Sequence, residues 1–104
     1  IIPKPEWRLR KETYISHIKS ASPSVRLVSS CDKVHNARTI LADYREKGDA
    51  VWERFKGRKD GSLWYYRSLV KEYKSSDESH PVFNELERIV REIYRLAGID
   101  YDQP

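Results

Sequence analysis

The chain has 104 residues, of which 38% are hydrophobic and 35% charged, and its formal net charge is +4. This length suits one domain with a single core and is too short for two. Because the 20 basic and 16 acidic residues are interspersed rather than gathered in blocks, nucleic acid is disfavoured as a partner. No run is apolar enough to cross a bilayer and no secretory signal opens the sequence, so we expect a cytoplasmic protein without a membrane partner. The sequence begins Ile1-Ile2-Pro3 and contains no Met, so we also expect a piece of something longer.

Two helices are predicted in the first half of the chain. Apolar residues recur at helical spacing over residues 6–21, beginning at Trp7. Ser22 followed by Pro23 is typical of a helix start, and Gly48 of a helix end, so the second helix covers about residues 23–48. We expect this helix to be central, because its apolar stripe is wide. Its predicted inward residues are Leu27, Val28, Cys31, Val34, Leu41 and Tyr44.

The second half predicts shorter helices joined by polar connections. Asp49 is the expected cap of a short third helix, and Lys56–Gly61 lacks periodicity, which predicts a flexible basic loop. Ser62 is the expected cap of a fourth helix that reaches Tyr73. Residues 74–79 predict an exposed connection, and Ser79 or His80 caps a last helix that begins at Pro81 and stops at Gly98. No segment alternates as a strand does, so the predicted fold class is all-α, a helical bundle of about five helices.

One stretch of the second helix concentrates polar side chains. Asp32, His35 and Asn36 share a helical face, which we expect to lie toward the core. A buried carboxylate needs a cation or donors, so Asp32 is either a metal ligand or the partner of a structural cation such as Lys33 or Arg38. His35 could ligate the same metal or be hydrogen-bonded in place. Asn36 could contact a nucleobase, a sugar hydroxyl or a metal-bound water, or bridge the helix to a loop.

Two further features are candidates for ligand contact. The run Trp64-Tyr65-Tyr66 places three rings on successive helical positions, so at least one ring faces away from the core. Tyr65 or Tyr66 could line a ligand cleft, and core or interface packing is the alternative. The Lys56–Gly61 loop could hold phosphate through its cations and amides or be a solvated turn. Cys31, the single cysteine, is predicted to be a small buried side chain.

Four stretches of the sequence carry a resemblance to a known family. They are residues 22–38 with the core Asp32-Lys33-Val34-His35-Asn36-Ala37-Arg38, then Leu41-Ala42-Asp43-Tyr44-Arg45, Trp52-Glu53-Arg54-Phe55 and Leu63-Trp64-Tyr65-Tyr66-Arg67. Together they resemble the carboxy-terminal part of a bacterial HD-domain phosphohydrolase, similar to the hydrolase domain of stringent-response (p)ppGpp hydrolases.

The resemblance implies that residues 1–104 form a single helical domain, the C-terminal fragment of an HD domain with a partial HD-domain fold. In the full-length relative, a divalent metal such as manganese activates water against a nucleotide phosphate. By this resemblance Asp32 is a metal ligand, and Lys33, Asn36, Tyr65 and Tyr66 are substrate-binding residues.

The chain also departs from the family pattern. The first His and the His-Asp doublet that complete the metal site are missing upstream of Asp32, and His17 has no Asp after it. One carboxylate is too few for a catalytic metal site. We therefore predict a remnant or fragment of a metal-dependent phosphohydrolase that acts on nucleotide phosphates, inactive and without bound metal on its own. The alternative is a small helical binding or assembly module in which Asp32, His35 and Asn36 form a hydrogen-bond network. In either case apolar surface left uncovered predicts a homo-oligomer.

Overall fold

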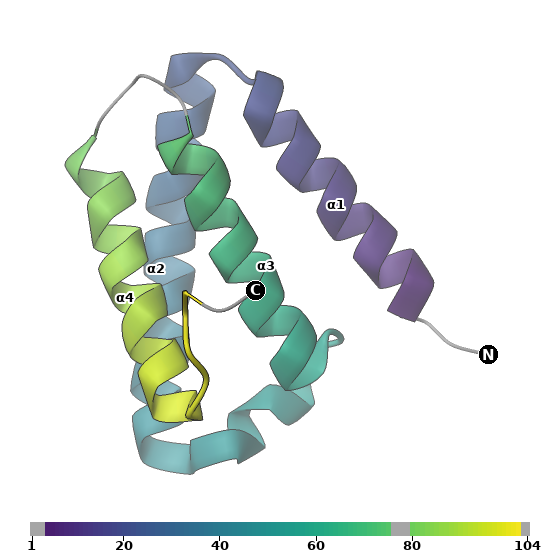
Figure 1. Cartoon of the computed structure of the whole chain (residues 1–104), viewed down its shortest axis with the longest axis vertical. Helices are drawn as coiled ribbons and strands as arrows, with labels where there is room; N and C mark the ends of the chain where they lie inside the picture. The colour runs from purple at the N-terminus through teal and green to yellow at the C-terminus, as the bar shows by residue number, and fades with distance from the viewer. Residues whose placement is uncertain (1–3, 76–79, 103–104) are drawn as a thin grey trace.

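The computed structural model describes residues 4–75 and 80–102 of the chain. In that part of the chain the elements are α1 (Lys4–Ser20), α2 (Pro23–Lys47), the 3-10 helix η1 (Gly48–Arg54), α3 (Arg58–Lys74) and α4 (Pro81–Ala97). The all-α prediction is confirmed. Helices α2, α3 and α4 lie side by side, and α1 packs chiefly on α3 at the edge of the bundle (Figure 1). No helix in the described ranges is both long and apolar enough to cross a membrane.

The helix boundaries follow the capping residues in the sequence. Ser22 precedes α2 in an extended conformation, and its side chain accepts a hydrogen bond from the Val25 N–H at 3.4 Å. Gly48 ends α2 at φ +67°, and Gly98 ends α4 in the left-handed conformation at φ +76°. His80 precedes α4 without a side-chain cap, and Ser79, the other predicted cap, lies outside the described residues.

The predicted inward face of α2 is correct at Val34 and Tyr44 and wrong at Val28 and Cys31. The buried residues of this helix are Arg26, Ser30, Val34, Ala37, Ile40 and Tyr44. Val28 is 70% exposed and Cys31 is exposed too, so Cys31 is not the buried small side chain that its apolar neighbours predicted. The buried line passes through a charged residue, and apolar spacing alone could not reveal that.

Arg26 is that buried charge, and its surroundings explain why α2 turns this face inward. Its guanidinium donates hydrogen bonds to the carbonyl oxygens of Ile18 at 2.7 Å, Glu72 at 2.8 Å and Tyr73 at 3.0 Å. These carbonyls lie in the last turns of α1 and α3, where backbone acceptors lack helical partners and the helix dipoles favour a cation. A single side chain therefore ties the ends of two helices to the start of α2.

The predicted basic loop and the predicted caps of the middle segment are also corrected. Gly61 N–H donates to the Gly57 carbonyl at 3.0 Å, so Lys56–Gly61 is mostly the first turn of α3 rather than a flexible loop. Ser62 is buried within α3 and caps nothing. Asp49 is not a cap either, since it accepts a hydrogen bond from the Tyr44 hydroxyl at 2.7 Å. The glycines that suggested a loop, Gly57 and Gly61, lie against the ring of Trp7.

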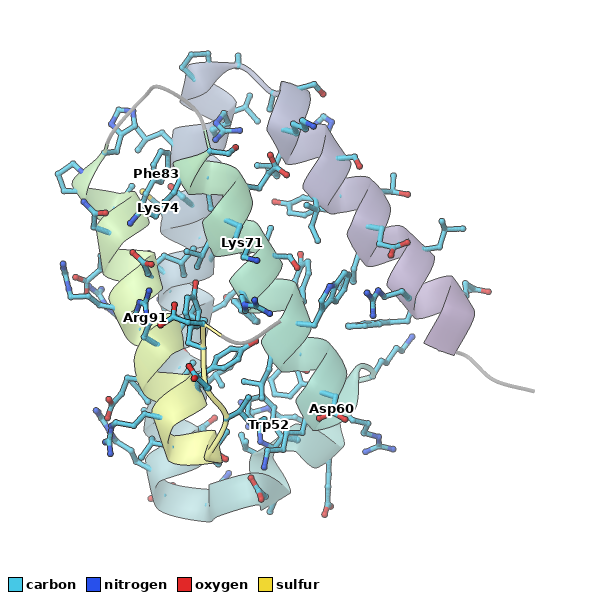
Figure 2. The ribbon with its side chains drawn as sticks, in the orientation of Figure 1. Trp52, Asp60, Lys71, Lys74, Phe83 and Arg91 are labelled. Atoms are coloured by element: carbon cyan, nitrogen blue, oxygen red, sulfur yellow. The ribbon has the colours of Figure 1, made fainter. Side chains whose placement is uncertain are left out.

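Contacts on two sides fix α4 against its neighbours. On the α3 side, the rings of Tyr73 and Phe83 stack with centroids 5.4 Å apart, and Tyr94 donates to the Leu63 carbonyl at 2.7 Å. Figure 2 shows Phe83 and Lys74 close together where α3 ends and α4 begins, with Arg91 farther along α4. On the α2 side, carboxylates of α4 pair with arginines of α2. The core lies between these three helices, and α1 adds Trp7 and Ile18 to it.

Candidate functional site

A pocket of about 190 Å³ lies where α1, α2, the end of η1 and the start of α3 meet. We call it the lysine–aromatic pocket, and its lining residues are Trp7, Lys11, Lys33, Asn36, Phe55, Lys56, Gly57, Ser62, Tyr65 and Tyr66. All four residues that the resemblance assigned to substrate, Lys33, Asn36, Tyr65 and Tyr66, are among them. The structure thus brings together side chains that stand 33 positions apart in the sequence, while their role in binding stays a prediction.

Trp7 forms one wall of the lysine–aromatic pocket, and two glycines make room for it. A Cβ atom on Gly57 would lie 2.4 Å from Cη2 and Cζ2 of Trp7, and one on Gly61 would lie 3.0 Å from the same ring. Only a residue without a side chain permits this approach. The indole is almost fully buried, and its ring meets that of Trp64 edge-on at 6.2 Å. The start of α1 is therefore held against the first turn of α3.

In the described ranges the lysines at the pocket outnumber the carboxylates paired with them. The Lys11 ammonium lies 4.6 Å from the centroid of the Tyr65 ring, and the Lys33 ammonium lies 5.9 Å from the same centroid. Burial, then Lys33, then Arg10 lower the pKa of Lys11 below its usual value. In the described part of the chain the one carboxylate paired with Lys33 is Asp32, at 3.7 Å, and none is paired with Lys11. Such a site favours an anion.

Tyr65 and Tyr66 supply rings and hydroxyl groups to the same pocket. Tyr65 is buried and Tyr66 half-buried, with ring centroids 5.5 Å apart and planes at 68°. Burial raises the pKa of Tyr65 well above its usual value and, with help from the charge of Asp32, raises the pKa of Tyr66 to about 12. Both hydroxyls therefore remain protonated at neutral pH and can donate hydrogen bonds.

Asp32 lies at the edge of this region, on the surface and not toward the core as predicted. Its side chain is 63% exposed, because the buried line of α2 passes along the opposite side of the helix. Asn36 is half-buried, and its Nδ2 donates to Asp32 Oδ2 at 3.5 Å. His35 is exposed. The predicted network of the three side chains is thus reduced to one long bond between Asp32 and Asn36.

The structure gives no metal cluster in the ranges that it describes. Within residues 4–75 and 80–102, no group of three His, Cys, Asp or Glu side chains is placed to hold a metal ion. Asp32 as a metal ligand stays a prediction. His17, on α1, is exposed and does not line the lysine–aromatic pocket.

A second hollow of about 370 Å³ continues from the first along α2. It shares Asn36, Phe55 and Tyr66 with the lysine–aromatic pocket and extends past His35 to Arg54. Arg54 is bonded to Asp43 at 2.7 Å, so its charge is already paired. The unpaired positive charge therefore lies on the Lys11 side of Tyr66.

Sequence reasoning missed Trp7 and Lys11, which α1 contributes to the pocket. The sequence predicts Trp7 only as the first apolar residue of the first helix, and Lys11 lies among the polar residues of the same stretch. One signal was available: Gly57 and Gly61 are four residues apart, so in a helix they lie on one face and form a notch for a large side chain. The sequence did not show which ring fills the notch.

Comparison with known proteins found no family model, curated protein or solved structure that matches this chain. The fold and the pocket together define a small all-α protein with a cationic, aromatic site.

Proposed function

We propose that this chain binds a nucleotide across the lysine–aromatic pocket and the hollow of about 370 Å³ that adjoins it, as the nucleotide-holding part of an HD-type phosphohydrolase. The observation that carries the proposal is the meeting of Lys11, Lys33 and Lys56 with Tyr65, Tyr66 and Trp7 around one pocket. Lysines suit phosphate oxygens and aromatic rings suit bases. The four substrate-binding residues implied by the sequence resemblance line the same pocket, which also supports the proposal.

Each part of the pocket has a distinct task in this proposal. Lys11 and Lys33 pair with phosphate oxygens, and the Tyr66 hydroxyl donates a further hydrogen bond to them. The exposed part of the aromatic wall stacks on the base. Asn36 can both donate and accept, so it suits the polar edge of a base or a sugar hydroxyl.

The lowered pKa of Lys11 gives the binding a pH dependence with a definite sign. Burial and the neighbouring Lys33 disfavour the charged ammonium in the empty pocket. A phosphate favours it, so binding at alkaline pH takes up a proton on Lys11. Affinity is expected to fall as the pH rises through the lowered pKa of Lys11, before ordinary lysines lose their charge at about 10.4.

We do not expect this chain to hydrolyse the nucleotide on its own. A catalytic zinc-type site uses about three protein ligands and an open position, and Asp32 offers one carboxylate. A divalent metal such as manganese therefore belongs to the full-length relative in this proposal. The purified chain with manganese and a guanine nucleotide should release no phosphate, and clear release would overturn this part of the proposal.

The binding proposal is tested by titrating the chain with guanosine diphosphate while following calorimetric heat. Lys11→Gln and Lys33→Gln should each weaken binding about tenfold, the effect of losing one hydrogen bond to a charged group. The matched control is Lys19→Gln, because Lys19 lies two turns after Lys11 on α1 and is exposed outside the pocket. Equal affinities for the Lys11 and Lys19 variants would contradict the proposal.

A second candidate function is self-association, and exposed apolar side chains favour it. Val28 is 70% exposed and Val25 is 46% exposed, both on α2, and Leu9 on α1 is 63% exposed. We propose that the chain forms a homo-oligomer that covers part of this surface. Light scattering over a range of concentrations tests it: Val28→Ser should lower the average mass, and a wild-type monomer at high concentration would contradict it.

A further inference from the structure

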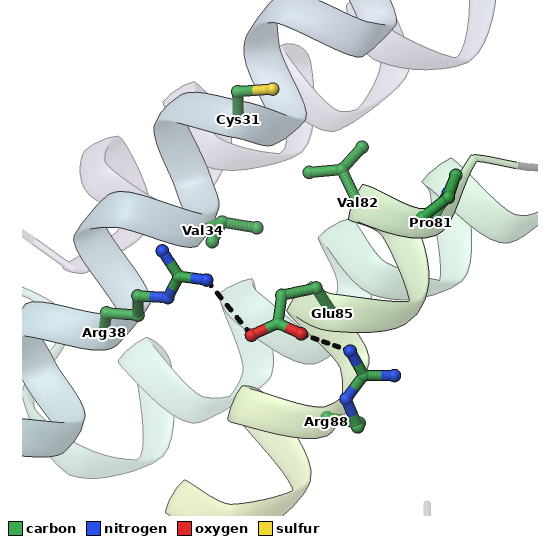
Figure 3. A pocket seen from close by; sticks show the side chains of 7 residues that line it. All are labelled: Cys31, Val34, Arg38, Pro81, Val82, Glu85 and Arg88. Atoms are coloured by element: carbon green, nitrogen blue, oxygen red, sulfur yellow. Dashed lines mark hydrogen bonds and ion pairs between the residues drawn. The ribbon is translucent and has the colours of Figure 1, made fainter.

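A groove of about 430 Å³ runs between α2 and α4, separate from the lysine–aromatic pocket (Figure 3). None of its lining residues belongs to that pocket or to the hollow beside it. One end is apolar, with Cys31, Val34 and Val82, and the other end carries Glu85 between the guanidinium groups of Arg38 and Arg88 (Figure 3). The volume falls within the range of small-ligand sites, about 300 to 1,000 Å³.

The groove lies beside the first of two similar ion-pair clusters between α2 and α4, where two short side chains take the places of longer ones. Glu85 pairs with Arg38 of α2 at 3.2 Å and with Arg88 of α4. Seven residues later in both helices the same arrangement recurs, with Glu92 paired to Arg45 at 3.7 Å and to Arg95 at 2.5 Å. Each of these triads, one glutamate with two arginines, joins α2 to α4. The ion pairs therefore do not explain why a groove lies beside the first triad.

The surroundings of the two triads differ in side-chain size. Cys31 and Pro81 border the first triad on its N-terminal side. The corresponding positions beside the second triad lie seven residues later. They are occupied by Arg38 and Arg88, which are themselves members of the first triad. Two long side chains are thus replaced by a thiol and a ring, and the space they would fill is left open at the first triad.

The charges of the groove favour a single negative charge. Arg38 and Arg88 carry two positive charges against the one of Glu85, and Glu85 is the only acceptor bonded to either guanidinium in the described ranges. A guanidinium has five N–H donors, so Arg38 and Arg88 can each donate hydrogen bonds to a further carboxylate. Pro81 begins α4 here, and the start of a helix adds positive potential.

We propose that this groove binds a short aliphatic carboxylate. The carboxylate lies between Arg38 and Arg88, and the alkyl chain lies on Val34 and Val82 beside Cys31. A multiply charged phosphate fits poorly, because the net charge available is one and half of the lining is apolar. The proposal does not depend on nucleotide binding, since the two sites share no residue.

Cys31 provides a direct assay, because it is the only cysteine of the sequence and is exposed at the groove. Its alkylation by neutral iodoacetamide is followed by mass spectrometry with increasing hexanoate. Hexanoate should slow the reaction severalfold and saturably, whereas hexanol and sodium chloride at equal concentrations should not. Amide shifts in a heteronuclear NMR titration should follow the same curve at Val82 and Glu85.

The variants separate anion recognition from the helix clamp. Arg88→Gln should weaken hexanoate binding about tenfold, as loss of a charged hydrogen bond does. Arg95→Gln breaks the equivalent pair one heptad later and should leave hexanoate binding unchanged. Equal effects of the two variants, equal protection by hexanol, or no protection by hexanoate would each overturn the proposal.

Discussion

The contact between Trp7 and two glycines of the η1–α3 junction gives the sharpest test of the packing. Gly57 has φ −77° and ψ −9°, which alanine adopts freely, so the backbone does not require glycine there. The obstacle to a side chain is the Trp7 ring, 2.4 Å from the position of a Cβ atom. Gly57→Ala should therefore destabilise the protein only as long as the indole is present.

The magnitude follows from the displacement that the ring must make. An ordinary contact needs at least 3.4 Å, so the ring or the junction has to move by about 1 Å. Overpacking of this kind costs about 1–3 kcal/mol, and we expect about 2 kcal/mol for Gly57→Ala. Gly61→Ala, with its Cβ at 3.0 Å, needs a smaller shift that the gain in helix propensity, about 1 kcal/mol, should largely offset.

Urea unfolding followed by circular dichroism, in a double-mutant cycle with Trp7→Ala, measures this coupling. In the Trp7→Ala background the cost of Gly57→Ala should vanish. Gly48→Ala is the control: nothing lies within 4 Å of its Cβ position, but its φ of +67° and ψ of −151° strain alanine by about 1–3 kcal/mol whether or not Trp7 is present. If Trp7→Ala leaves too little stability, Trp7→Leu takes its place. An equal cost of Gly57→Ala in both backgrounds would refute the reasoning.

Three further predictions follow from the charged residues. Arg26→Ala should cost about 3 kcal/mol in urea unfolding, because it removes the hydrogen bonds of a buried guanidinium to three carbonyls and the packing of its side chain, and a cost below about 1 kcal/mol would contradict the role of this guanidinium. The hydrogen bond from Lys74, with Arg91 nearby, lowers the pKa of Glu87 in the folded protein. The contribution of ionised Glu87 to the free energy of unfolding is therefore complete above the pKa of the unfolded chain, about 4.3, and is lost as the pH falls through the lower pKa of the folded protein. Glu87→Gln should therefore flatten the acid side of the stability curve, and an unchanged slope would count against the pairing. Asp32 is exposed, so Asp32→Ala should change the free energy of unfolding by less than about 0.5 kcal/mol. If Asp32 is a metal ligand, the same variant should lose affinity for manganese. Destabilisation by Asp32→Ala without any change in binding would favour the hydrogen-bond network instead.

The sequence by itself determined where α2 and α4 begin and end. Pro23 after Ser22, Pro81 after His80, and the glycines at 48 and 98 act on the backbone locally, so their effect does not depend on the rest of the fold. The apolar residues of α4 recur at helical spacing, and Phe83, Leu86, Ile89, Val90 and Ile93 lie in the core, whereas Leu96 in the last turn is exposed. Both signals are carried by residues close together in the chain.

Only the tertiary structure decided which way α2 faces and what the central glycines do. Arg26 is buried because the ends of α1 and α3 meet at its guanidinium, 8 and up to 47 residues away, and this burial places Cys31 and Asp32 outside. Gly57 and Gly61 belong to a helical turn because Trp7, some 50 residues earlier, fills their notch. The lysine–aromatic pocket has the same origin, since α1 brings Trp7 and Lys11 to the tyrosines of α3. Contacts between distant segments set these features, and local spacing carries no record of the distance between helices in space.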